Sequence, residues 1–346
     1  MTTFYIVRHC EAEGNIQKRM HGTFDSDITA KGKQQLEYLK KRMENVNIDA
    51  IYSSPLSRAY KTAKVISDNH NLPIITDIRL CERAIGKFED CTWHQLKQLY
   101  PKEFYDWRQD LPNYVIEGGE SEKMSVARFK DILFDIAKNY DGKTVLIASH
   151  SMVMKSLFES LFGKELPYSD NTAVSKLKIS SQTKEIQAEF LNDNSHLPEG
   201  LSSLGKEIWW KSSGNLDSYS IVYEYGYNSF TSSIFGKTEQ KEFINKNIIS
   251  GKLYTGEYIG AAVYEISGKK CEMLYLHMLP QFQKLGYATQ ILGQIQINSR
   301  IVGAEQIVIK NEDPSIEFLA FSRKNSLQAV GNEYLKGVSP KRVLSI

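Results

Sequence analysis

Two histidines follow directly on short apolar runs that are typical of buried strands. His9, with Arg8 before it, ends the first run, and His150 ends a later one. In open parallel sheets ligands bind beyond the carboxyl ends of the strands, so we expect both imidazoles at one edge. A third cation, Arg58, falls in the first turn of a predicted helix, where backbone amides add partial positive charge. Converging groups of this kind suit a dianion, and phosphate is the commonest one.

The elements that must position these residues alternate apolar strands with amphipathic helices, the pattern of a layered α/β domain. Helices are indicated by apolar residues at three- and four-residue steps, and Thr29 is a predicted N-cap. In the first half we predict strands at 4–7, 49–53, 144–148, 174–179 and 185–191, and helices at 29–46, 56–67, 124–140 and 151–162. The polar, turn-rich segment 192–200 is the predicted domain boundary. Beyond it we predict strands at 256–266, 271–279 and 306–310, and helices at 288–301 and 315–323.

Composition limits the classes of partner. A chain of 346 residues favours two domains, and 43 basic against 41 acidic residues argue against nucleic acid or an anionic membrane. The four cysteines form no C-x-x-C pair. The sequence also lacks an H-E-x-x-H motif and the paired-aspartate spacing of metal hydrolases, so a metal hydrolase is not favoured. The start lacks a signal-peptide layout, and no apolar stretch approaches the roughly 20 residues that cross a bilayer. We therefore expect a reduced, cytoplasmic protein without metal.

Arg8 with His9, Arg58 and His150 each lie in one of an ordered series of sequence blocks. The blocks are Val7–Asn15, His21–Gly32, Tyr52–Ala63, Leu80–Glu89, Gly118–Ser121 and Ala148–Ser151. The first block reads V-R-H-C-E-A-E-G-N and resembles the R-H-G-E-x-x-x-N opening of the histidine phosphatase superfamily, and the others resemble its later motifs. The resemblance covers residues 1–198. It implies a three-layer phosphoglycerate-mutase-like α/β domain with a mostly parallel sheet. Cys10 and Ser151 stand where glycine is common, and both are small enough to predict only a tuned pocket.

The resemblance also implies the chemistry, which is metal-independent phosphoryl transfer from a small phosphorylated metabolite. His9 would be the nucleophile that forms a phosphohistidine. The groups that would hold the phosphate oxygens are Arg8, Arg58 and His150. Further hydrogen bonds to phosphate or substrate would come from Asn15, Gly22 and Thr23. Glu82 would protonate the leaving oxygen and then activate water, with Glu89 as the alternative acid. Phosphatase and mutase activity both remain open, and phosphatase is favoured because no long insertion is evident.

A second group of residues lies in the last third of the chain, where a predicted strand leads through a small-residue turn into a helix. Such a turn exposes backbone amides that can hold a pyrophosphate. The segment resembles the Q/R-x-x-G-x-G/A signature of GNAT-type N-acetyltransferases. The resemblance implies that residues 199–346 form an α+β domain with a mostly antiparallel sheet, which binds acetyl-CoA and an amine acceptor. The residues implied to contact acetyl-CoA are Leu276, Met278, Gln283, Lys284, Leu285, Gly286, Tyr287, Ala288 and Thr289.

The C-terminal segment departs from this second family at one functional position. The tyrosine that can protonate the leaving thiolate is replaced by Ser322 or Phe321, and neither side chain is a good acid. Three alternatives stay open for this half of the chain. It could transfer an acetyl group to an amine, bind the cofactor without transfer, or serve as a non-catalytic packing module that makes a homodimer.

Overall fold

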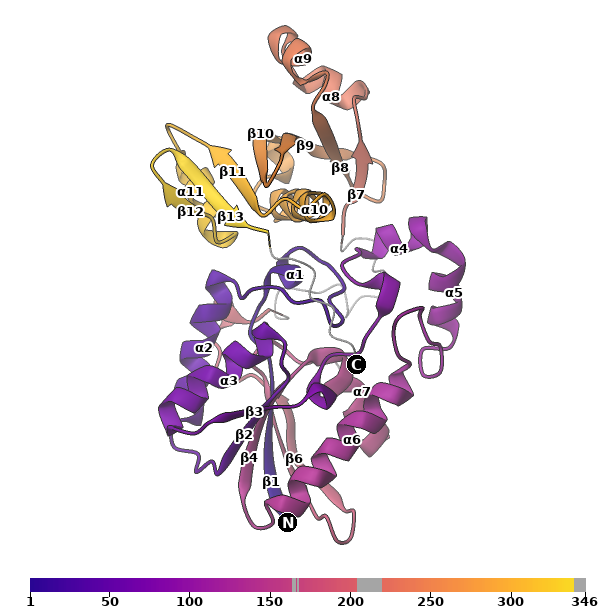
Figure 1. Cartoon of the computed structure of the whole chain (residues 1–346), viewed down its shortest axis with the longest axis vertical. Helices are drawn as coiled ribbons and strands as arrows, with labels where there is room; N and C mark the ends of the chain where they lie inside the picture. Colours follow the sequence, from indigo (N-terminus) through magenta and orange to yellow (C-terminus); the bar gives the residue numbers. More distant parts are fainter. Residues whose placement is uncertain (164–165, 167, 204–219, 339–346) are drawn as a thin grey trace.

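The computed structural model describes residues 1–163, 166, 168–203 and 220–338, and these form two units that each carry a sheet (Figure 1). The N-terminal unit, residues 2–193, has a six-stranded sheet of order β3-β2-β4-β1-β5-β6. Strands β1 to β4 pair in parallel, whereas β5 pairs antiparallel with β1 and β6 antiparallel with β5. The strands are β1 (Thr2–Arg8), β2 (Ala50–Ser53), β3 (Ile74–Thr76), β4 (Thr144–Ser149), β5 (Val174–Ile179) and β6 (Ile186–Asp193).

Helices cover both faces of this sheet (Figure 1). They are α2 (Ala30–Met43) and α3 (Ser57–His70) on one face, and α6 (Glu122–Asn139) and α7 (Ser151–Phe162) on the other. Because side chains alternate along a strand, Phe4 and Ile6 pack in the core with α6 and α7, whereas Val7 packs with α2 and α3. This three-layer arrangement confirms the predicted α/β architecture of the N-terminal unit.

Local signals in the sequence fix where two of these helices begin and end. Thr29 accepts a hydrogen bond from the Gly32 N–H at 2.9 Å, so the predicted N-cap of α2 is confirmed. Helix α7 begins directly after His150 and ends at Gly163, whose φ of 64° is a left-handed conformation that glycine adopts at little cost. The start of α7 is therefore fixed beside the end of β4.

Short elements lie beyond the carboxyl ends of the parallel strands (Figure 1). The sequence analysis did not predict them. They are α1 (Glu13–Ile16), η1 (Ile78–Leu80), η2 (Gly86–Phe88), α4 (Trp93–Leu99) and α5 (Pro101–Gln109). A small apolar core that includes Met20, Phe88 and Trp107 packs α4 and α5 against η2. This core fixes the segment that carries Glu82 and Glu89.

The C-terminal unit, residues 222–337, has a seven-stranded sheet of order β12-β13-β11-β10-β9-β8-β7. Neighbouring strands are antiparallel except for β10 and β11. The strands are β7 (Val222–Tyr225), β8 (Asn247–Lys252), β9 (Tyr258–Ser267), β10 (Lys270–Met278), β11 (Gln306–Lys310), β12 (Gln328–Val330) and β13 (Glu333–Gly337). Its helices are α8 (Ser229–Ile234), α9 (Lys237–Phe243), α10 (Tyr287–Ile301) and α11 (Ile316–Lys324), with a short η turn at Pro280–Phe282. A further η turn, Glu199–Leu201, precedes this unit and contacts α2.

Helix α10 is one of the elements through which the two units contact each other. Ile291, Leu292 and Ile295 of α10 pack in the core of the C-terminal unit. Its other side lies towards α1 of the N-terminal unit (Figure 1). No helix in the described ranges combines the length and apolar character needed to span a bilayer.

Candidate active site

The two strand-end histidines lie side by side. Strands β1 and β4 are neighbours with Arg8 opposite Ser149, and the His9 N–H donates to the Ser149 carbonyl at 2.9 Å. The ring centroids of His9 and His150 are 5.2 Å apart and their planes are inclined at 54°. Only 3% of His9 and none of His150 is exposed. The sheet edge therefore brings together the two imidazoles that the sequence placed there.

One hydrogen bond orients the His9 ring. Its Nδ1 lies 2.6 Å from the carbonyl oxygen of Cys10. Because a carbonyl can only accept, Nδ1 carries the hydrogen, and in the neutral ring Nε2 keeps a lone pair. Burial, followed by the positive charges of Arg58 and Arg8, holds the pKa of His9 well below the usual 6.5. At neutral pH this ring is an uncharged nucleophile.

Arg58 is a buried cation that is only partly satisfied. Its Nη1 donates to the Phe24 carbonyl at 2.7 Å and its Nη2 to the Gly22 carbonyl at 2.9 Å, while its Nε has no hydrogen-bond partner. The nearest carboxylate is Asp25, 4.0 Å from Nη1. A fully buried guanidinium with one N–H unsatisfied is costly unless an anion completes it. This group therefore indicates an anion site.

The two other residues predicted to hold the phosphate oxygens, Arg8 and His150, lie at the ends of β1 and β4. His150 Nε2 lies 2.9 Å from the Ser54 hydroxyl, and its buried Nδ1 has no hydrogen-bond partner. Burial, and then the charge of Arg58, lowers the pKa of His150 well below 6.5. Arg8 donates through Nη1 to the Ser169 carbonyl. The sequence analysis assigned no role to Ser54, and its contact with His150 is a feature of the folded site.

Glu82 is held at the start of α7. Its carboxylate accepts the backbone N–H groups of Met152 at 3.0 Å and Val153 at 2.8 Å, together with that of Arg83 at 2.9 Å. These bonds fix the carboxylate against the helix that begins next to His150. Glu89 lies on the other side of the loop, where Oε1 accepts both the backbone N–H and the hydroxyl of Thr23 at 2.8 and 2.7 Å. The two candidate acids thus have different surroundings.

The three predicted substrate-binding residues have protein partners in this structure. Asn15 Oδ1 accepts the Ala12 N–H at 2.9 Å, and Thr23 donates to Glu89. Gly22, at a φ of 52°, gives its carbonyl to Arg58, and a β-carbon on it would lie 2.5 Å from the Glu89 carboxylate. A role in binding substrate stays a prediction for all three, and what their positions establish is the packing of the loop around Arg58.

The predicted cofactor segment lies in the C-terminal unit. Gln283 donates to the Met278 carbonyl at 3.1 Å, and Lys284 and Gly286 have left-handed φ angles of 62° and 90°. Tyr287, Ala288 and Thr289 form the first turn of α10. Of the other three predicted contacts, Leu276 and Met278 pair with β9, and Leu285 is exposed. In the described part of the chain, β10 pairs with β11 over 270–273, and 275–278 pair with β9 alone, because β11 ends at Lys310.

The comparisons decide the family. The sequence model of the histidine phosphatase superfamily (branch 1) matches residues 4–193. The chain belongs to the histidine phosphatase superfamily. It is 30% identical over 204 residues to phosphoserine phosphatase 1 of Hydrogenobacter thermophilus, which covers 58% of this chain and 96% of that protein. It is also 33% identical over 167 residues to the probable phosphoglycerate mutase GpmB of Enterobacter sp., covering 47% of this chain and 76% of that one.

A solved structure has a similar fold over the N-terminal unit. Bacillus stearothermophilus YhfR superposes with a TM-score of 0.53 at 32% identity, covering 57% of this chain and 99% of that one. Membership of the histidine phosphatase superfamily makes the N-terminal unit an enzyme, either a phosphatase or a mutase. The family match ends at residue 193, so the GNAT resemblance of the C-terminal unit stays a prediction.

The buried imidazoles predict how stability depends on pH. Burial is the first cause that lowers the pKa of His9, His21, His150 and His196, the last to about 4. Below about pH 6.5 these histidines bind protons in the unfolded chain but not in the folded chain. The free energy of unfolding is therefore constant above pH 6.5 and falls below it, by up to roughly 1.4 kcal/mol per pH unit for each histidine. Urea midpoints at pH 7.5 and 5.5 measure this, and a midpoint that stays unchanged contradicts it.

Proposed function

We propose that this chain is a phosphomonoesterase that works through a phosphohistidine at His9. The proposal is supported above all by one pair of groups: His9, with Nδ1 bonded to a carbonyl, and Arg58, whose buried Nε has no hydrogen-bond partner. Transfer of a phosphoryl dianion requires a neutral nucleophile beside an unsatisfied cation. The substrate class is a small phosphorylated metabolite.

The reaction proceeds in two steps. The lone pair on His9 Nε2 attacks phosphorus, the P–O bond to the leaving group breaks, and Glu82 gives its proton to the departing oxygen. Water then attacks the phosphohistidine, Glu82 takes a proton from that water, and the P–N bond breaks. Phosphate leaves and His9 is again neutral. The groups that hold the equatorial oxygens as charge spreads over them are Arg8, Arg58 and His150.

Phosphatase activity is favoured over mutase activity. The alignment with phosphoserine phosphatase 1 extends over 96% of that relative, against 76% for the probable phosphoglycerate mutase GpmB. The test gives the purified chain phosphoserine and 3-phosphoglycerate, with a chelator present, and measures free phosphate and phosphoglycerate isomers. Phosphate release from either ester without isomers supports the proposal. Isomers without phosphate establish a mutase, and turnover that stops with the chelator contradicts a metal-independent reaction.

We also propose that the C-terminal unit binds acetyl-CoA at the start of α10. The specific observation is the left-handed Gly286 at the N-terminus of a 15-residue helix, after a strand whose last residues, 275–278, pair with β9 and not with β11. Amides of such a turn suit a pyrophosphate. Ser322 is buried and Phe321 packs against the core, so neither supplies an acid for thiolate release. Acetyl transfer to an amine and a non-catalytic dimerisation role remain the alternatives.

Replacing Gly286 with alanine is expected to weaken acetyl-CoA binding about tenfold, because a β-carbon disfavours the left-handed turn by roughly 1–2 kcal/mol. The measurement is calorimetric titration with acetyl-CoA. Gly303→Ala is the matched control, since Gly303 is also left-handed (φ 82°) and lies just after the other end of the same helix. Equal affinities of the two variants, or no heat of binding to the unchanged chain, would refute the proposed site.

A further inference from the structure

Helix α10 contacts the N-terminal unit through paired polar side chains. Gln296 accepts from Gln17 at 2.9 Å, and Gln294 accepts from Arg19 at 2.7 Å and from Gln95 at 3.0 Å. Gln17, Arg19, Gln294 and Gln296 are all buried. These buried hydrogen bonds favour one relative placement of the two units, because breaking any of them leaves an unsatisfied polar group.

The backbone of α10 comes very close to this network. A β-carbon on Gly293 would lie 2.7 Å from the side-chain carboxamide carbon of Gln17, so glycine is what lets Gln17 lie flat on the helix. On β13 of the same unit, Lys336 forms a buried ion pair with Glu13, at 2.5 Å. The C-terminal unit thus packs directly on α1 and the segment after it, which follows His9 in the chain.

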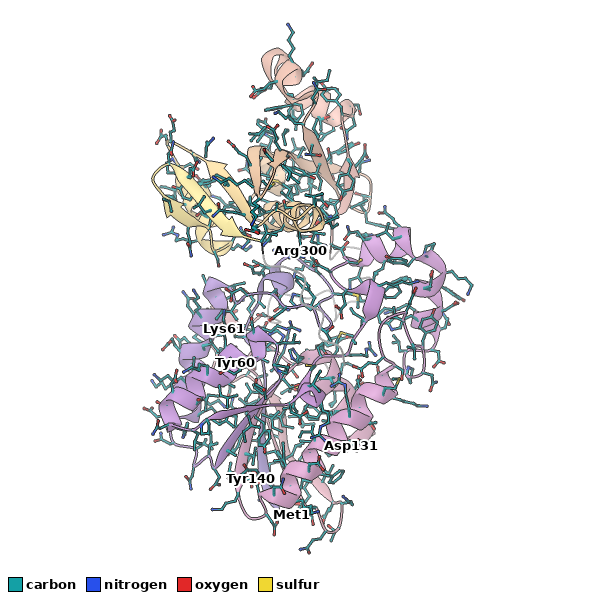
Figure 2. The ribbon with its side chains drawn as sticks, viewed as in Figure 1. Met1, Tyr60, Lys61, Asp131, Tyr140 and Arg300 are labelled. Atoms are coloured by element: carbon teal, nitrogen blue, oxygen red, sulfur yellow. The ribbon has the colours of Figure 1, made fainter. Side chains whose placement is uncertain are left out.

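Arg300, in the last turn of α10, lies on the side of the C-terminal unit that faces the N-terminal unit (Figure 2). Its Nη1 lies 2.6 Å from Asp90 Oδ2, and both side chains are largely buried. Its guanidinium carbon lies 4.4 Å from the centroid of the Phe24 ring, within cation–π distance. Arg300 therefore holds Phe24 from one side and anchors itself on Asp90.

Phe24 passes this constraint on to Arg58. The Phe24 carbonyl accepts from Arg58 Nη1, and the Gly22 carbonyl, two residues earlier, accepts from Nη2. These are the two hydrogen bonds that orient the buried guanidinium, because its nearest carboxylate is 4.0 Å away. A shift of the 22–24 backbone would therefore move the Arg58 guanidinium that these two carbonyls hold.

We propose that Arg300 of the C-terminal unit is a positioning residue for phosphoryl transfer, acting through Phe24 on Arg58. The inference rests on the proposed function of the N-terminal unit and adds to it. The phosphatase site is completed by a helix from the other half of the chain. Arg300 itself does not touch the substrate, so its loss should weaken catalysis without abolishing it.

The experiment uses the full chain with p-nitrophenyl phosphate as substrate. Arg300→Met is expected to lower kcat/KM about tenfold, the scale of a slightly misplaced catalytic group. Arg300→Lys keeps the charge beside Asp90 but not the planar stack on Phe24. Its kcat/KM should therefore lie between those of the unchanged chain and Arg300→Met. Arg323→Met, which changes an exposed arginine of the same unit, is the matched control and should be unchanged.

A pH profile separates positioning from a general loss of structure. The charged groups that face His9 are Arg58 from α3 and Arg8 from β1, and the titratable groups beside it are His21 from the loop and the His150 ring. Arg58 and Arg8 lower the pKa of His9, so a displaced Arg58 should move the acidic limb of kcat/KM to higher pH in Arg300→Met. A partly unfolded sample would lower kcat/KM at every pH by the same factor and leave the acidic limb at the same pH.

The outcomes distinguish this inference from the proposed function. A loss confined to the Arg300 variants, graded through lysine and accompanied by the shifted limb, supports the inference. Turnover by the unchanged chain with an Arg300→Met variant equal to it in kcat/KM and pH profile overturns the inference alone. An unchanged chain that neither turns over the ester nor labels His9 overturns the proposed function, and the inference with it.

Discussion

Replacing His9 with alanine should lower kcat on any phosphomonoester by at least about 10⁴-fold, the scale seen when a covalent nucleophile is removed. The variant keeps Arg58, His150 and Glu82, so substrate should still bind. It lacks the atom that bonds to phosphorus, and the ester would have to be attacked directly by water. Initial rates of phosphate release on p-nitrophenyl phosphate and on phosphoserine measure the loss.

The control for this variant is His70→Ala, at the end of α3. His70 contacts the Met43 carbonyl and takes no part in the site, so its replacement should leave the rate within a factor of about two. A His9→Ala variant that keeps more than about a hundredth of the activity would mean that another group is the nucleophile.

Replacing Glu82 with glutamine should have an effect that depends on the leaving group. Phosphoserine needs a proton on its departing alkoxide, so kcat/KM, which reports the first step alone, should fall by about 10² to 10⁴-fold. p-Nitrophenolate is stable as an anion, so kcat/KM for its ester should fall far less. Glutamine keeps the shape of the side chain and one carbonyl acceptor for the amides of α7. The measurement is the fall in kcat/KM from the unchanged chain to Glu82→Gln, compared between phosphoserine and p-nitrophenyl phosphate.

Glu89→Gln is the informative comparison because Glu89 is the alternative acid. Glu89 holds Thr23 by two hydrogen bonds, so its replacement should disturb the loop and slow both substrates to a similar extent. If Glu89→Gln slowed phosphoserine selectively and Glu82→Gln slowed both equally, the assignment of the acid would have to be reversed.

The parts of the site that the sequence could predict are those fixed by local pattern. An apolar strand followed at once by His9 or His150 has one place in a parallel sheet, and the structure puts the two rings in contact there. The Thr29 cap and the limits of α7 follow from residues within one turn. The short elements between 78 and 109 were missed because the aromatic core around Trp107 holds them in place. No local periodicity in the sequence predicts that core.

Long-range contacts were beyond the sequence for a different reason. Gln290, Gln294 and Gln296 are polar residues of α10, yet all three are buried. Their partners include Gln17, 279 positions earlier in the chain. In the same way, nothing near Ser54 predicts its contact with His150, because β2 and β4 become neighbours only in the folded sheet. A polar residue reveals its partner only once the fold is known.

The most direct test of the central claim is to trap the intermediate. The chain would be mixed with an isotopically labelled phosphomonoester, quenched within milliseconds in alkali, and digested for mass spectrometry. We predict up to one phosphoryl group per chain, located on His9, stable in alkali and lost in acid, because the bond is a P–N bond. A rapidly turning-over enzyme that carries no label, or that carries it on another residue in an acid-stable form, would contradict the account.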